Sequence, residues 1–136
     1  MFKKDDVFSG KYTYQSVSVD GKMTTAIDKE KIKILEVNGN IFSVRIYFFY
    51  DFDKKKYNSS TLGIGIYNKK KNTFKIFESL YEEPITAANR PSIEVSLLKG
   101  EYNGNAIRIK FLEATNTPAR NTENILYAYE AILFKR

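Results

Sequence analysis

The amino-acid sequence predicts an all-β fold, in which eight strands form an antiparallel up-and-down meander that closes into a barrel. The first observation is Ile41–Phe52, whose even-numbered positions are all apolar or aromatic, as in a strand with one buried face. The second is the even spacing of further alternating segments, without a confident helix between them. A β-sandwich is the alternative, because it too would protect the sheet edges. The third observation is three pairs that favour tight hairpin turns: Asp20-Gly21, Asn38-Gly39 and Asn103-Gly104.

The first two strands are predicted from shorter patterns. Phe8–Val19 is expected to be the first strand, and a change of apolar phase along it predicts a bulge near Gln15-Ser16. Lys31–Val37 is expected to be the second strand. A short helix over Asp28–Leu35, capped by the aspartate, is the alternative for this part of the chain.

The remaining strands follow at regular spacing, and the whole chain, residues 1–136, is expected to be one domain. Gly63 and Gly65 share one face of their strand, which is typical of a close approach or a barrel corner. Long irregular stretches at 82–91 and 113–123 would fall at one end of the meander, opposite the short turns. The later strands are predicted as Ile41–Phe52, Tyr57–Tyr67, Thr73–Tyr81, a strand beginning at Ile93, Ile107–Phe111 and Ile125–Phe134.

Composition excludes most familiar catalytic and metal sites. The chain has no Cys and no His, so it lacks thiolate nucleophiles, imidazole bases and the usual zinc ligands. Asp51 and Asp53 are interpreted as solvated carboxylates beside lysines, and Ser59–Thr61 as exposed strand without a base. We therefore expect no metal site, no cofactor and no enzymatic activity.

The chain is basic, with a net charge of +6 and a pI near 9.4. Such a charge favours contact with nucleic acid or another anionic surface, but it is also typical of a solvated lysine-rich surface. The topology would place Lys54–Lys56 and Lys69–Lys71 at opposite ends of the barrel, which argues against one continuous basic patch. Nucleic-acid binding is therefore the third hypothesis for function.

Targeting features are lacking in the sequence. No long apolar run follows the first lysines, and no stretch approaches the roughly 20 apolar residues of a membrane span. A cytoplasmic location is expected, although a secreted chain whose signal peptide had been removed would look the same.

The arrangement of strands and turns resembles that of the calycins, the lipocalins and their short relatives. Gly10-Lys11-Tyr12 occupies the place of the lipocalin G-x-W motif, with Tyr for Trp. Glu101-Tyr102 is similar to the acidic-Tyr pair of the second lipocalin motif, and Lys135 or Arg136 corresponds to the terminal Arg that closes over the first strand. The resemblance implies an eight-stranded barrel that binds a small apolar or amphipathic ligand at its loop-rich end.

The first functional hypothesis follows from that resemblance and from the many tyrosines. A non-enzymatic barrel would bind a small amphipathic molecule among inward-facing aromatic and aliphatic side chains. Alternatively, the same side chains would simply fill the interior. The candidate cavity residues are Tyr12, Tyr14, Phe42, Val44, Ile46, Phe48, Tyr50, Tyr127 and Tyr129.

The second hypothesis is a protein-interaction module, such as an inhibitor, immunity or phage-type accessory protein. It would use aromatic residues on the outer face, because an exposed apolar patch is typical of a protein partner or a homo-oligomer. Arg45 would lie beside aromatic neighbours on this face. The candidate partner-binding residues are Arg45, Tyr47, Phe49, Phe77 and Tyr81.

Overall fold

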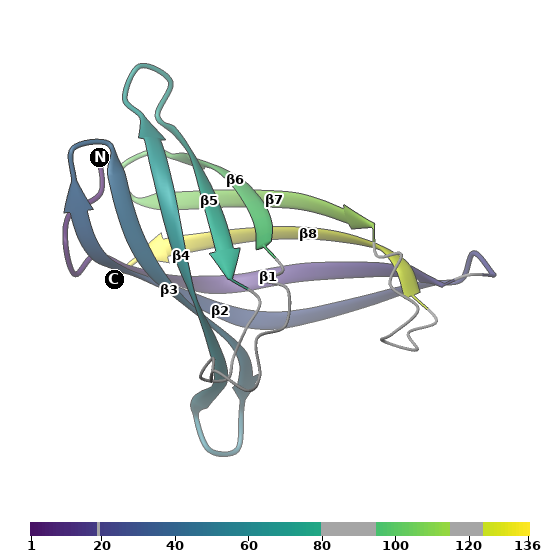
Figure 1. Ribbon diagram of the computed structural model, residues 1–136. Coiled ribbons are helices and arrows are strands. Elements are labelled where there is room, and N and C mark those ends of the chain that lie inside the picture. Colours follow the sequence, from purple (N-terminus) through teal and green to yellow (C-terminus); the bar gives the residue numbers. More distant parts are fainter. Residues whose placement is uncertain (19, 80–94, 115–123) are drawn as a thin grey trace, which may run out of the picture.

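The protein is an eight-stranded antiparallel β-barrel in which every strand pairs with its neighbours in sequence and the last pairs with the first (Figure 1). The computed structural model describes residues 1–18, 20–79, 95–114 and 124–136, without the side chains of 79, 95–96, 111–114 and 124–127. In these ranges all regular structure is strand, and no helix is long and apolar enough to cross a membrane. The strands are β1 (Val7–Ser18), β2 (Met23–Asn38), β3 (Ile41–Asp51), β4 (Lys56–Asn68), β5 (Thr73–Ser79), β6 (Val95–Tyr102), β7 (Ala106–Ala114) and β8 (Asn124–Lys135).

Closure confirms the predicted barrel and excludes the sandwich. β1 and β8 pair antiparallel from Phe8 opposite Lys135 to Ser18 opposite Asn124. The predicted second strand is confirmed. β2 is one strand of 16 residues, so the alternative helix over 28–35 does not form, because pairing with β1 and β3 satisfies the strand's backbone. The bulge predicted near Gln15-Ser16 does not form at these residues, and the register of β1 against β8 shifts instead between Val17 and Ser18.

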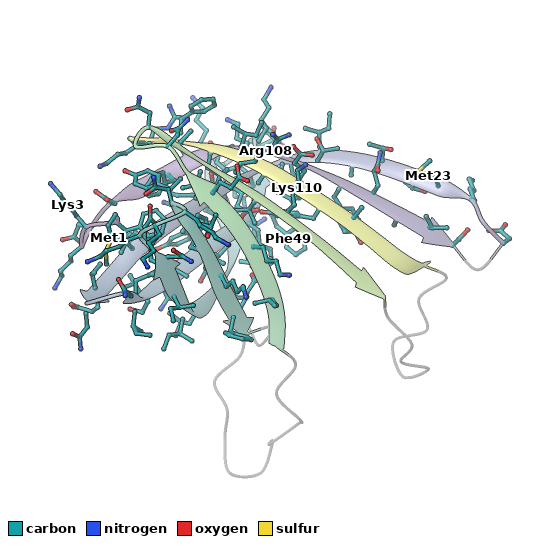
Figure 2. The ribbon with its side chains drawn as sticks, turned by 90° about the horizontal axis from the view of Figure 1, so that it is seen from above. Met1, Lys3, Met23, Phe49, Arg108 and Lys110 are labelled. Carbon is teal, nitrogen blue, oxygen red and sulfur yellow. The ribbon has the colours of Figure 1, made fainter. Side chains whose placement is uncertain are left out.

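The two ends of the barrel differ, as the turn lengths predict. The connections β2–β3, β4–β5 and β6–β7 are short turns at one end, where both chain termini also lie (Figure 1). Met23, at the start of β2, lies far from Met1 and Lys3 (Figure 2). The β1–β2 and β3–β4 connections lie at the other ends of the strands, which we call the loop-rich end.

The end with the short turns is sealed by Phe2. Its ring is only 4% exposed, and five other aromatic rings lie with their centroids 4.9–5.6 Å from its own. A turn holds the segment in place, because Asp5 N–H donates to the Ile34 carbonyl and Ile34 N–H donates to the Asp6 carbonyl. We call this cluster the aromatic plug: Phe2, Phe8, Phe42, Tyr67, Phe74 and Tyr102.

Glycines on neighbouring strands make room for two rings of the plug. Gly65 lies directly opposite Phe42, and Gly100 lies directly opposite Phe74. A Cβ atom at either glycine would overlap the facing ring. The prediction that Gly63 and Gly65 mark a close approach is therefore confirmed, since Gly63 also lies within contact distance of the Val44 and Ile76 side chains.

β3 changes the direction of its side chains at Phe49, which has φ of +55° in the left-handed region. Phe48 pairs with Ser59 and Tyr50 with Tyr57, leaving residues 49 and 58 outside the ladder. Alternation along β3 therefore breaks at this point, and Tyr50 falls on the same side of the wall as Tyr47.

Candidate functional site

The interior between the aromatic plug and the loop-rich end is lined by polar residues around Glu30. This residue lies on β2 in phase with the buried Ile32 and Ile34, directly opposite Gly10 of β1. It is only 3% exposed. A carboxyl group is seldom buried to this extent without a partner, because burial removes the hydration of its charge.

Glu30 has a single hydrogen-bond partner among the described residues. The hydroxyl of Tyr129 on β8 donates to its Oε2 atom. Its buried Oε1 atom has no partner in the described part of the chain. Burial raises the pKa of Glu30 from 4.5 to about 8, the bond from Tyr129 acts in the opposite direction, and the charge of Glu78 adds to the rise. The carboxyl group is therefore largely protonated at neutral pH.

Two tyrosines pack together beside this carboxyl group. The rings of Tyr12 and Tyr129 lie 5.3 Å apart between centroids, and both pack against the buried core. Burial, and then the charges of Asp28 and Glu30, raise the pKa of Tyr12 to about 12. Burial and Glu30 likewise raise the pKa of Tyr129 well above its ordinary value. Both phenols therefore keep their protons and remain hydrogen-bond donors.

Further carboxyl groups lie in the interior around Glu30. Thr61 is buried and donates from Oγ1 to Oε1 of Glu78 over 2.7 Å. Asp28 pairs with Tyr12 and shares the inward face of β2 with Glu30. Lys11, Lys29 and Lys31, the lysines of β1 and β2 that adjoin Glu30 and its partner Gly10, occupy outward positions. The site around Glu30 thus combines carboxyl groups with phenols.

The predicted cavity residues fall into separate groups. Tyr12, Tyr14, Phe48 and Tyr129 lie on the inward face towards the loop-rich end, and they are only partly buried. Three others, Phe42, Val44 and Ile46, belong to the fully buried core. The prediction that Tyr50 faces inward is wrong, since its ring contacts Lys29 and Tyr57 on the outer face. The side chain of Tyr127 lies outside the described residues.

The predicted partner-binding residues do not form one cluster in the described structure. Arg45 donates to Ser60 Oγ over 3.1 Å, and Tyr47 packs against Tyr57. Phe49 contacts Phe48, whereas Phe77 lies apart, opposite Ile64 on β4. Tyr81 lies outside the described residues.

Glu30 and Phe2 are the important residues that the sequence interpretation missed. The period-two pattern that places Ile32 and Ile34 inward also places Glu30 inward, so a signal was present for this residue. Phe2 lies outside any alternating segment, so no comparable signal marks it. Comparisons of the chain with protein-family models, with curated protein sequences and with solved structures find no match.

Proposed function

We propose that this barrel is a lipocalin-like binding protein that takes a small amphipathic molecule at its loop-rich end. The observation that carries the proposal is the buried Oε1 atom of Glu30, which has no partner among the described residues. A buried polar atom without a hydrogen bond costs about 1–3 kcal/mol. A ligand that forms a hydrogen bond with this atom would recover that free energy.

Differences in burial along the interior support entry from the loop-rich end. The plug residues are almost completely buried, so this end of the barrel is closed. Tyr12, Tyr14 and Phe48 also face inward, yet each remains partly exposed. Their rings would contact the apolar part of a ligand, while Glu30 would bind its polar group.

The polar group is expected to be a hydrogen-bond donor, and preferably a cation. Asp28 and Glu78 place further carboxyl groups beside Glu30 and Tyr12. An ammonium group would form a charge-assisted hydrogen bond with Glu30 and favour its ionised form. A carboxylate on the ligand would instead be repelled.

Features of the lipocalin resemblance support the same proposal. Gly10 lies against β8 so closely that a Cβ atom there would overlap the Ile132 carbonyl oxygen. Tyr12 faces inward, as the aromatic residue of the motif would, and Tyr102 donates to the Gly104 carbonyl over 3.0 Å. The Arg136 guanidinium donates to Ser9 on β1, which is the contact expected of the terminal Arg.

Native mass spectrometry tests the proposal directly, by comparing the purified protein before and after denaturing extraction. A second experiment tests the polar anchor, using displacement of the fluorescent probe N-phenyl-1-naphthylamine by dodecylamine, dodecanol and dodecanoic acid at pH 8. Because a charge-assisted hydrogen bond is worth about 1.5–3 kcal/mol, we expect the amine to displace the probe at roughly tenfold lower concentration than the alcohol.

The variant Glu30→Gln should remove this preference, whereas Glu101→Gln, an exposed substitution on β6, should leave it unchanged. Two results would rule out the site: failure of the probe to bind, or an equal preference for the amine in the wild type and in Glu30→Gln.

A protein-interaction module is the second candidate function, because one outer surface is strongly apolar. Ile64 is 56% exposed and lies opposite Phe77, which is 50% exposed and itself lies opposite Leu97. Exposed apolar surface of this kind is typical of protein–protein contacts. We call this surface the apolar strip: Ile41, Leu62, Ile64, Ile66, Phe77 and Leu97.

We expect a specific partner to be captured from native lysate by the wild type and lost with the double variant Ile64→Lys and Phe77→Lys. The double variant Lys70→Glu and Lys71→Glu in the β4–β5 turn is the control and should retain the partner. Equal capture by all three proteins would argue against the apolar strip.

A further inference from the structure

The outer face of the barrel carries a groove of about 620 Å³ across β1–β4. This volume lies in the range of about 300–1,000 Å³ that is usual for small-ligand sites. The groove is separate from the interior site, because Lys11, Lys29 and Lys31 line it from outward positions of β1 and β2. We call it the basic groove. Its cationic lining residues are Lys11, Lys29, Lys31, Lys55, Lys56 and Arg136.

Among the described residues, no carboxylate side chain lines the basic groove. None of its lysines takes part in an ion pair in the described part of the chain, where the paired lysines are Lys4, Lys33, Lys110 and Lys135. Arg136 is held at one side of the groove, since its Nε donates to Ser9 Oγ over 2.5 Å. Such an accumulation of unpaired cations favours a ligand with several negative charges.

Tyrosine rings form the wall of the groove between these cations. Tyr50 and Tyr57 lie 4.9 Å apart between ring centroids, and Tyr47 lies 6.0 Å from Tyr57. The Nζ atom of Lys31 lies 4.3 Å from the Tyr47 ring centroid, and that of Lys29 lies 4.6 Å from the Tyr50 centroid. Lys29 and Lys31 therefore each rest on a tyrosine ring. A ligand phosphate that attracted either ammonium group would also uncover the ring beneath it.

We propose that the basic groove binds single-stranded nucleic acid, with phosphates against the lysines and bases stacked on the tyrosines. Cations combined with aromatic rings are the usual means by which proteins bind single strands without strict sequence preference. A free mononucleotide brings about two negative charges at neutral pH, as phosphomonoesters do, too few for the six cations. A duplex hides its base faces, so the tyrosines would have no stacking partner.

The test is fluorescence anisotropy of a labelled oligothymidylate of about 12 nucleotides, a length within the usual range of site sizes. We expect the double variant Lys29→Gln and Lys31→Gln to weaken binding about tenfold or more. Loss of two phosphate contacts should also reduce the slope of log K against log salt by about 1.4. The matched control is Lys69→Gln with Lys71→Gln, which removes the same charge from the β4–β5 turn and should change affinity less than about twofold, because single strands track a defined groove.

A second pair of variants tests stacking. Tyr47→Phe keeps the ring and should bind normally, whereas Tyr47→Leu should weaken binding roughly five- to hundredfold, the usual value of one stacked base. Circular dichroism checks that each variant is folded. The proposal is overturned by absence of binding at low salt, by equal weakening in the two lysine pairs, or by equal binding of Tyr47→Leu and Tyr47→Phe. It is also overturned if inorganic polyphosphate, a duplex or thymidine monophosphate competes as well as the single strand.

Discussion

Replacing Glu30 with glutamine is expected to stabilise the protein by several kcal/mol at pH 8 and to have little effect near pH 4.5. The side chain is buried inside the barrel, and its pKa is raised from 4.5 to about 8 by that burial. Near pH 4.5 and below, the carboxyl group is largely neutral in the folded state, so an amide of similar shape changes little. The amide oxygen of glutamine also accepts the hydrogen bond that Tyr129 donates to Glu30.

The direction of the pH effect follows from where the proton is bound. Between pH 4.5 and about 8, the folded wild type keeps a proton on Glu30 that the unfolded chain has released. The folded state thus binds more protons, and the free energy of unfolding falls as pH rises, by about 1.4 kcal/mol for each unit. Over the whole window the loss amounts to at most roughly 5 kcal/mol. The other carboxyl groups described in this interior are those of Asp28 and Glu78. The chain has no histidine that would titrate in this pH range.

Urea denaturation at several pH values between 4.5 and 8.5 measures this effect. We expect the wild type to lose stability steadily across the window and Glu30→Gln to show a flatter profile. Glu101→Gln, an exposed substitution, should follow the wild type. Parallel profiles for the wild type and Glu30→Gln would show that the carboxyl group is not held neutral in the barrel.

Much of the fold is predictable from the sequence because β-strands leave a local pattern. Alternation over Ile41–Phe52 predicts β3 almost to its observed end at Asp51. The Asn38-Gly39 pair predicts the β2–β3 turn, where Gly39 has φ of +62°. Weakly patterned segments are harder to predict, as at 23–28. Pairing with β1 extends β2 to Met23, although that segment has little alternation of its own.

The candidate site is less predictable because it depends on contacts between distant residues. Tyr50 has the phase of an inward residue in the sequence, but the left-handed conformation of Phe49 turns it outward. Phe is not a residue that marks such a conformation, so nothing local predicts the change. The basic groove likewise joins Lys11 and Arg136 with residues of β2–β4, which only barrel closure brings together.

Replacing Phe2 with alanine is expected to destabilise the protein by about 3–5 kcal/mol, the usual cost of removing a buried phenylalanine side chain. Five aromatic rings surround the ring of Phe2 at the end with the short turns. For a domain of this size the loss corresponds to a fall in Tm of about 10–20 °C, which thermal unfolding followed by circular dichroism measures.

Phe134→Ala is the matched control, because this phenylalanine on β8 is 53% exposed on the outer face and should lose about 1 kcal/mol or less. If Phe2→Ala does not fold, Phe2→Leu replaces it, with a smaller expected loss of about 1–2 kcal/mol. Equal losses at the two alanine positions would mean that the aromatic plug does not close the barrel. A much larger loss at Phe2 would support the closed end on which our proposal depends, since a ligand could then reach Glu30 only from the loop-rich end.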